Sequence, residues 1–248
     1  MRVAATWSGG KDCYTACHKA IEQGHEVAFL LTFQYMEPYI FHSLPIMELQ
    51  SKTMGIPQWL IKIPSQVIPH IYVDIQEPIA RLKKEEGVEG IVTGDIDSTR
   101  HKPMWDKMVK ELGMELITPL WDWSGHQYPG IRYRERVLDM ELSTGMKAII
   151  NCIDQKYFSE EWLGREFNKS CVQEMKAKVG PSGVGIDATG EFGEFHTTVL
   201  DSPLFKESID ITKFSKKTLV TDHGGLPPTG NFLYMNIEEA VLKQKIVR

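Results

Sequence analysis

The first ten residues constrain the fold more than any other part of this chain. An apolar run at residues 3–7 leads directly into Ser8, Gly9 and Gly10, and a helical pattern of apolar positions follows at residues 12–23. Gly24 ends that pattern, and a second apolar run covers residues 26–33. This order predicts a strand, a glycine turn, a helix and a second strand, which is the opening unit of a parallel sheet.

The same alternation continues through the first half of the sequence. Strands are predicted at residues 59–63, 88–93 and 115–117, and helices at residues 44–54, 66–86 and 104–112. Pro69 and Pro78 are expected to interrupt the second of these helices. Strands that alternate with helices predict an α/β fold with a doubly wound, mostly parallel sheet that is covered on both faces.

The second half of the sequence predicts a smaller C-terminal α+β domain. Strands are expected at residues 146–153, 195–200 and 208–211, a helix at 160–168, and a final strand and helix within 232–243. Residues 121–130 are polar and aromatic and contain Gly and Pro, so they are the candidate for a hinge or a lid. We therefore expect one domain at residues 1–125 and a second at 126–248.

Charge and composition argue against several classes of protein. The chain has a formal net charge of -5 and no long run of Lys or Arg, so a nucleic-acid partner is disfavoured. No segment is apolar over the length needed to span a bilayer, so we expect a cytoplasmic protein without a membrane segment. The cysteines form no CxxC pair, and a chain of this size needs no disulfides, so reduced thiols are expected.

Residues 8–13, Ser-Gly-Gly-Lys-Asp-Cys, have the features of an anion-binding loop. Gly9 and Gly10 have no side chains, so backbone amides can approach phosphate oxygens, and the following helix points its free amides at the same place. Lys11 adds a positive charge and Ser8 a hydroxyl. The alternative is a plain glycine turn with Lys11 in solvent, but the position directly after an N-terminal strand favours nucleotide binding.

This loop resembles SGGKDS, the pyrophosphate loop of the N-type ATP pyrophosphatases, and the whole chain resembles the diphthine ammonia ligase (diphthamide synthase) family of that superfamily. Four further segments carry the resemblance in the order found in the family. They are Phe41-His42 with Leu49-Gln50 before Gly55-Ile56-Pro57, then Gly90-Ile91-Val92-Thr93-Gly94, then Trp162-Leu163-Gly164-Arg165, and finally residues 190–197. The resemblance implies a doubly wound fold that uses ATP, usually with Mg²⁺, to adenylate a substrate.

The resemblance also implies roles for individual positions. The residues expected to hold the nucleotide's phosphates or their metal are Ser8, Gly9, Gly10, Lys11, Asp12 and Cys13, with Asp12 as the candidate Mg²⁺ ligand. The backbone at Thr32 and Phe33 is expected to accept adenine. Gly94, Asp95 and His42 are expected to lie near the nucleotide. These positions mostly follow predicted strands, and a doubly wound sheet binds ligands at the carboxyl ends of its strands.

Cys13 stands where the family loop ends in Ser. Three interpretations are open: a tolerated substitution, a redox-sensitive switch on ATP binding, and a catalytic nucleophile, which an adenylation mechanism does not require. A helix N-terminus beside Lys11 is expected to lower the pKa of the Cys13 thiol and to make it reactive.

A second departure follows Gly94, where the family tends to have a Ser-x-Tyr-Gln segment that leads into basic residues. Ser98 matches that pattern, whereas the Tyr-Gln pair is missing and Arg100, His101 and Lys102 follow. These basic side chains could neutralise pyrophosphate, or they could form a solvated turn before a helix.

Residues 190–197, Gly-Glu-Phe-Gly-Glu-Phe-His-Thr, form the second motif. Taken alone, they read as an acidic turn that leads into a strand. The resemblance implies that the substrate is bound by Gly190, Glu191, Gly193, Glu194, His196 and Thr197. Glu191 and Glu194 could bind the trimethylammonium group of diphthine, or one of them could remove a proton from ammonium, with His196 as the rival base.

The resemblance thus implies an ATP-dependent, AMP-forming amide ligase, with a nucleotide-binding domain at 1–125 and a substrate-binding domain at 126–248. The residues expected to act in catalysis are Lys11, Asp12, Glu194 and His196. A diphthine-like carboxylate is expected to be adenylated and then amidated by ammonia. Elongation factor two is the candidate protein substrate, and a homodimer is the candidate assembly. The alternatives are an adenylating ligase for another small carboxylate and a non-catalytic sensor of ATP or AMP.

Overall fold

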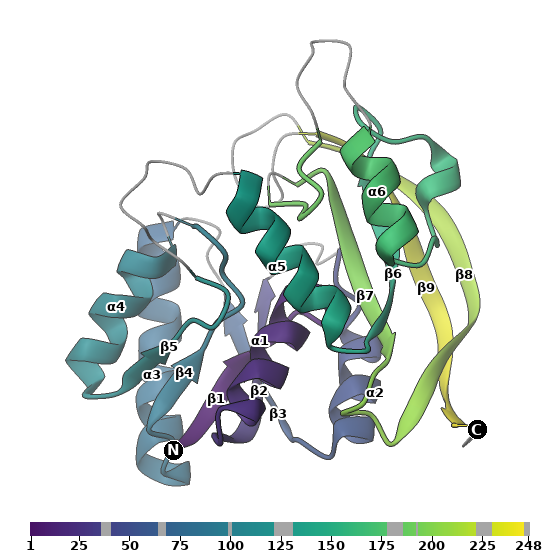
Figure 1. The fold of residues 1–248 in the computed structure, drawn as a ribbon. Coiled ribbons are helices and arrows are strands. Elements are labelled where there is room, and N and C mark those ends of the chain that lie inside the picture. The colour runs from purple at the N-terminus through teal and green to yellow at the C-terminus, as the bar shows by residue number, and fades with distance from the viewer. Residues whose placement is uncertain are drawn as a thin grey trace.

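The computed structural model describes residues 1–35, 41–63, 68–98, 101–121, 131–177, 186–191, 193–221 and 230–245. Two sheets lie side by side in it (Figure 1). The elements of the first half are β1 (Arg2–Thr6), α1 (Lys11–Glu22), β2 (Glu26–Tyr35), α2 (Leu44–Met54), β3 (Gln58–Ile63), α3 (Ile68–Glu86), β4 (Gly90–Val92), α4 (His101–Leu112) and β5 (Glu115–Ile117). Those of the second half are α5 (Ile131–Ser143), β6 (Lys147–Asp154), the 3₁₀ turn η1 (Glu160–Trp162), α6 (Lys169–Ala177), β7 (Phe195–Asp201), β8 (Glu207–Thr221) and β9 (Gly230–Gln244).

The first sheet is parallel throughout and has the strand order β3-β2-β1-β4-β5. The chain moves outward from β1 to β3 and then returns to the other side of β1 for β4 and β5. The strand order therefore reverses between β1 and β4, and such a switch point opens a crevice at the carboxyl ends of the two strands. The predicted α/β fold with a doubly wound parallel sheet and a smaller C-terminal region is confirmed.

Alternating side chains of β1 face two separate cores. Ala4 packs on one face with residues of α3 and α4, such as Ile79 and Trp105. Val3 and Ala5 pack on the other face with Cys17 of α1 and with residues of the second sheet. As Figure 1 shows, α3 and α4 cover the outer face, while α1 and α2 lie between the two sheets. Two-sided burial explains why these strands read as continuous apolar runs.

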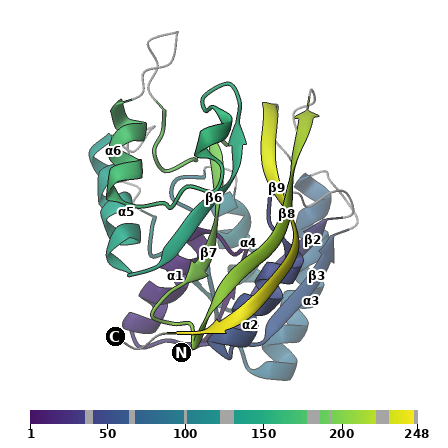
Figure 2. The ribbon, with the colours of Figure 1, turned by 90° about the vertical axis from the view of Figure 1, so that its right-hand side faces the viewer.

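The second sheet is antiparallel, with the strand order β7-β6-β9-β8 (Figure 2). Its strands β8 and β9 pair along almost their whole length of 15 residues each. The predicted short strand at 208–211 is only the start of β8, and the predicted helix near residue 243 is wrong. Glu238, Glu239 and Ala240 favour a helix intrinsically, but pairing with β8 overrides that preference.

The predicted helix at 160–168 is also wrong. Only the short turn η1 forms there, because Gly164 adopts a left-handed conformation with φ of 87°. The chain beyond Gly164 runs beside β6, where Ile150 N donates to Arg165 O and Phe167 N donates to Ala148 O. Helix α6 begins only after Asn168, whose Oδ1 accepts a hydrogen bond from Cys171 N.

The predicted break in α3 does not occur. The helix includes Pro78 and is continuous over its 19 residues. Pro69 stands in the first turn, where a missing N–H removes no helical hydrogen bond. Helices α5 and α6 were not predicted. The predicted hinge at 121–130 lies outside the described residues after Trp121, as does the predicted domain boundary at 125–126, which stays a prediction.

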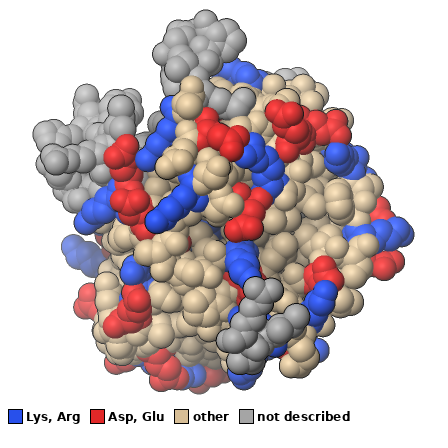
Figure 3. Space-filling view, turned by 45° about the vertical axis from the view of Figure 1, so that its right-hand side comes forward, with Lys and Arg blue, Asp and Glu red and all other residues tan. Residues whose placement is uncertain are grey.

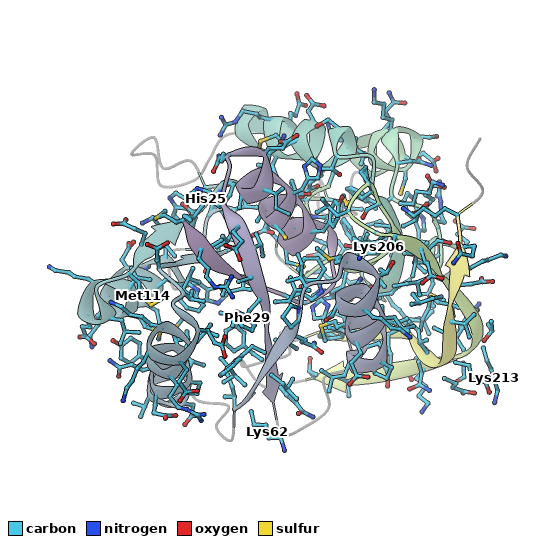
Figure 4. All side chains as sticks on the ribbon, turned by 90° about the horizontal axis from the view of Figure 1, so that it is seen from below. His25, Phe29, Lys62, Met114, Lys206 and Lys213 are labelled. Carbon is cyan, nitrogen blue, oxygen red and sulfur yellow. The ribbon has the colours of Figure 1, made fainter. Side chains whose placement is uncertain are left out.

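Acidic and basic side chains are interspersed on the face shown in Figure 3, without a patch of one sign. Figure 4, viewed from below, shows Lys206 beside α2, where Lys206 N donates to Thr53 O, and Lys213 at the outer side of the β8–β9 hairpin. Within the described ranges, no helix combines the length and the apolar character that crossing a membrane requires.

Candidate active site

The loop from Ser8 to Gly10 joins β1 to α1 at the switch point of the sheet. Gly9 has a φ of 79°, and a Cβ atom there would lie 2.6 Å from Gln50 Oε1. A Cβ atom at Gly10 would lie 3.1 Å from the carbonyl oxygen of Thr197. Both positions therefore need glycine, one for its conformation and both for the close packing of the loop.

Gln50 of α2 holds this loop. Its side chain is fully buried, and Nε2 donates to Gly9 O at 3.0 Å and to Val199 O at 2.8 Å. Its Oε1 accepts a hydrogen bond from Trp7 Nε1 at 2.9 Å. Val199 N on β7 also donates to Gly9 O at 2.9 Å. The second sheet thus helps to shape the loop, a role that the sequence did not indicate for Gln50.

Lys11 is buried to 2% exposure at the start of α1. Its Nζ lies 2.6 Å from Asp12 Oδ1 and 3.1 Å from Glu141 Oε1. Its backbone N donates to Thr197 Oγ1 at 3.1 Å. Burial on its own would lower the pKa of Lys11, but the carboxylates of Asp12 and Glu141 outweigh burial and hold that pKa above its usual value. Lys11 is thus a fixed positive charge at the loop.

Glu141 is the residue of this cluster that sequence reasoning missed. It comes from α5, which packs against α1, and its side chain is completely buried. Val137 and Leu138 are buried on the same helix. The spacing of these three positions puts a carboxylate on the apolar face of an amphipathic helix, and that pattern is the signal that could have pointed to Glu141.

Gly94, at the carboxyl end of β4, packs directly against the first turn of α1. A Cβ atom there would lie 2.9 Å from both Asp12 C and Cys13 N, which only glycine avoids. Asp95 follows it, and Asp95 Oδ1 lies 2.8 Å from His101 Nδ1. The structure therefore brings Gly94 to the helix start that follows the loop from Ser8 to Gly10, while Asp95 contacts the start of α4.

The basic residues after Gly94 are partly occupied by local contacts. Lys102 Nζ lies 2.7 Å from Asp106 Oδ2, one turn along α4. Ser98 Oγ accepts a hydrogen bond from His101 N, so Ser98 caps the helix. Arg100 lies outside the described residues. These contacts favour the second alternative, in which Lys102 and His101 belong to a turn before a helix.

Thr32 and Phe33 lie where β2 extends beyond β1. The pairing of β1 with β2 ends at Thr6 and Leu31, whereas β2 continues beside β3 as far as Tyr35. Thr32 Oγ1 donates to Trp7 O at 3.3 Å and accepts a hydrogen bond from Gln58 Nε2. This end of β2 therefore lies beside the loop that follows β1.

The second motif bends twice before it enters β7. Gly190 and Gly193 have φ values of 77° and 84°, and Phe192 between them lies outside the described residues. Burial, together with the neighbouring Asp12 carboxylate, raises the pKa of Glu191 well above its usual range. Glu194 is 3% exposed, and its Oε1 accepts a hydrogen bond from Asp187 N at 3.3 Å. Glu191 is thus the acid that neighbours the loop charges, while Glu194 contacts its own turn.

His196 and His42 meet beside the loop. The His196 ring stacks on Phe41 with centroids 4.5 Å apart, and the His42 ring stands edge-on to it at 5.5 Å. Burial and the neighbouring His42 lower the pKa of His196 to about 3, and burial lowers that of His42 to about 4. This lowering of its pKa makes the ring neutral and only weakly basic, which disfavours His196 as the rival base.

Comparisons with known proteins agree with this arrangement. The model of the diphthamide synthase N-terminal domain matches residues 1–116, and that of the C-terminal domain matches residues 135–225. The chain belongs to the diphthamide synthase family. The curated relatives include diphthine–ammonia ligases of Bos taurus and Homo sapiens, each 25% identical over 97% of this chain and 94% of the relative. A third, from Mus musculus, is 23% identical over 99% of this chain and 94% of the relative. This member of the family is accordingly an ATP-dependent ligase.

Cys13 differs from the expectation of a reactive thiol. Its side chain is 6% exposed, its Sγ lies 3.2 Å from Gly10 O, and Ser8 Oγ lies 3.5 Å from the same sulfur. Burial raises the pKa of the Cys13 thiol, so the predicted lowering of that pKa is wrong. This result favours the interpretation of Cys13 as a tolerated substitution.

A thiol titration tests this conclusion. Cys13, Cys17, Cys152 and Cys171 are free and buried. In the native protein, all of them are expected to react with a thiol reagent at least about a hundredfold more slowly than after unfolding, because reaction requires local opening. One thiol that reacts at once in the native protein, and that disappears in Cys13→Ser, would restore the idea of a reactive Cys13.

Among the described residues, no group of three or more His, Cys, Asp or Glu side chains is arranged to hold a metal ion. A Mg²⁺ that accompanies a nucleotide does not need such a group, because it binds through one or two carboxylates, the phosphates and water. The Asp12 carboxylate is 32% exposed at the end of the phosphate loop, which suits that role.

Proposed function

We propose that this protein joins ammonia to the carboxylate of a diphthine-like residue and cleaves ATP to AMP and pyrophosphate in doing so. The observation that carries the proposal is the buried ammonium of Lys11 at the start of the helix that follows a glycine loop, at the switch point of the sheet. Membership of the diphthamide synthase family, and relatives named diphthine–ammonia ligase, support the choice of substrates.

In the first step, the substrate carboxylate attacks the α-phosphorus of ATP. The bond from that phosphorus to the bridging oxygen breaks, and pyrophosphate leaves. The amides of the loop from Ser8 to Gly10 and the ammonium of Lys11 stabilise the charge that develops on the phosphates. Lys11 pairs with Asp12 and Glu141, so phosphate oxygens compete with these carboxylates for its N–H groups.

The remaining nucleotide contacts follow from the loop. Adenine would lie against the backbone at Thr32 and Phe33, where β2 extends beyond β1. Gly94 and His42 border the same region, and Asp95 follows Gly94. Mg²⁺ would be held by Asp12 together with the phosphates, and it would supply neutralisation of phosphate charge.

In the second step, the lone pair of ammonia attacks the carbonyl carbon of the acyl-adenylate. A C–N bond forms, the bond from carbon to the phosphate oxygen breaks, AMP leaves, and the excess proton passes to solvent. Glu191 neighbours the charges of the loop, and a trimethylammonium group beside it would favour its ionised form, so Glu191 is the candidate to balance that group of the acceptor. Gly190, Gly193, Glu194, His196 and Thr197 complete the predicted acceptor site.

The test measures AMP and pyrophosphate formed from ATP, Mg²⁺ and ammonium, with elongation factor two that bears diphthine and with the same factor lacking it. Repeated turnover that requires both diphthine and ammonium, and that forms an amide on the factor, is the expected result. Release with a different carboxylate would instead identify another adenylating ligase. Tight ATP binding without release under any of these conditions would favour the sensor and would contradict the proposal.

A further inference from the structure

Among the buried polar atoms without a hydrogen-bond partner, two belong to side chains that contact Phe41 beside the candidate active site. They are Asn151 Oδ1 on β6 and His196 Nε2 on β7, judged over the residues that the structure describes. The Asn151 side chain is 2% exposed. An unmatched polar atom in the interior is unfavourable, so each such atom in a native protein calls for an explanation, such as a ligand or a bound water.

The two atoms belong to one small region, because both side chains contact Phe41. Asn151 Nδ2 donates to Phe41 O at 2.7 Å, and the His196 ring stacks on the Phe41 ring with an interplanar angle of 8°. The register of β6 with β7 also shifts between Ile150 and Cys152, the residue that pairs with His196. Asn151 is thus the extra residue of this bulge and lies next to the position opposite His196.

The chemistry of these atoms suits a small ligand that donates hydrogen bonds. Because Asn151 Nδ2 donates to Phe41 O, its Oδ1 is left as a pure acceptor. The His196 ring is neutral, and its Nε2 accepts a hydrogen bond in the tautomer that carries the proton on Nδ1. Phe41, Cys152 and Phe232 form a buried apolar cluster at the same place. Aromatic faces and two acceptors suit a small nitrogen donor.

We propose that Asn151 Oδ1 and His196 Nε2 bind the ammonia that the ligase consumes. This proposal rests on the proposed function, since it assigns the site of one of its substrates. The place is suitable, because Thr197, the next residue after His196, accepts the hydrogen bond from Lys11 N at the phosphate loop. His196 acts here as a neutral hydrogen-bond partner and takes no proton from the ligand.

The test replaces Asn151 with leucine, which has a similar shape and no polar atoms. AMP formation is measured against ammonium concentration at saturating ATP and acceptor. The KM for ammonium is expected to rise about tenfold, because the variant loses one hydrogen bond to the ligand. The KM values for ATP and for the acceptor are expected to change less than about threefold. Asn151→Asp keeps an acceptor oxygen and is expected to recover most of the affinity for ammonium.

Asn236→Leu is the matched control. Asn236 is half-buried on β9, and its Nδ2 donates to Ser215 Oγ, away from the phosphate loop. An unchanged KM for ammonium in Asn151→Leu would mean that the two atoms bind only an internal water and would overturn the proposal. A rise confined to the KM for the acceptor would overturn it too, because the N–H donor would then belong to the acceptor.

A second readout separates this proposal from the proposed function. Exchange of pyrophosphate with ATP needs the acceptor but no ammonia. If the natural protein shows no such exchange, this result argues against the proposed function but not against the ammonia site. In that case, the ammonia site is decided by thermal unfolding in ammonium chloride against equal sodium chloride, because a ligand that binds the native state raises Tm. A Tm increase specific to ammonium that Asn151→Leu abolishes supports the site, and equal Tm values in the two salts overturn it.

Discussion

Lys11→Met is expected to lower the rate of ATP cleavage by about 10²- to 10³-fold. This is the usual effect of removing one preorganised hydrogen-bond donor that stabilises the charge developing in a transition state. Methionine keeps the length and packing of the lysine side chain but cannot contact phosphate oxygens through N–H groups. The measurement is pyrophosphate release at saturating ATP and acceptor. ATP binding, measured separately, shows whether the loss lies in binding or in the chemical step.

Lys19→Met is the matched control for this substitution. Lys19 stands on the same helix, is 26% exposed, and pairs with Glu22 at the surface. The control is expected to retain full activity, because an exposed ion pair contributes little. If Lys11→Met retained more than about a tenth of the activity while folded, Lys11 would not be the charge that stabilises the phosphates.

Glu141→Leu is expected to lower the free energy of unfolding by about 3 kcal/mol, because it leaves the buried ammonium of Lys11 with Asp12 as its remaining close carboxylate. The change is measured as a shift of the urea midpoint at constant m-value. Glu141→Gln keeps an oxygen acceptor for Lys11 and is expected to lose less. Glu135→Gln, an exposed position on the same helix, is the control and is expected to change stability by less than about 0.5 kcal/mol.

The double variant Lys11→Met with Glu141→Leu makes the two effects separable. Apolar groups replace both charges, so stability is expected to recover relative to Glu141→Leu while activity stays low. Recovery of stability without activity would assign Glu141 to the support of Lys11. If the loss of stability in the double variant instead equalled the sum of the losses in the two single variants, the two side chains would not be coupled. The contact between them would then contribute nothing to stability.

The sequence predicted the part of the fold that local pattern determines. An apolar strand, two glycines and an amphipathic helix at residues 3–23 predict one arrangement, and the structure has the loop from Ser8 to Gly10 between β1 and α1 as this pattern predicts. The same pattern indicated Lys11 as a neighbour of the nucleotide, and the family resemblance added Asp12. The family resemblance implied that Gly94 lies near the nucleotide, and its close packing on Asp12 shows that the ends of β1 and β4 meet.

The features that the sequence did not predict depend on contacts between segments that are far apart along the chain. The pairing of β8 with β9 fixes a hairpin whose residues favour a helix or a loop when they are considered alone. Glu141 meets Lys11 across 130 positions of sequence, and Gln50 meets Val199 across 149. The pKa of His196 depends on burial beside His42, which no local pattern encodes. Such features need the folded chain, because burial and charge contacts arise only after the two sheets pack.

The hydrogen bond from Val199 N to Gly9 O, with Gln50 joined to both residues, has a consequence for how such proteins can be divided. A fragment that ends after β5 would retain the loop sequence but lose the strand that fixes its carbonyl group. Exchanging halves between distant relatives would therefore disturb nucleotide affinity unless α2, the loop and β7 were inherited together. Recombination is expected to conserve these three segments as one unit, although they are far apart along the chain.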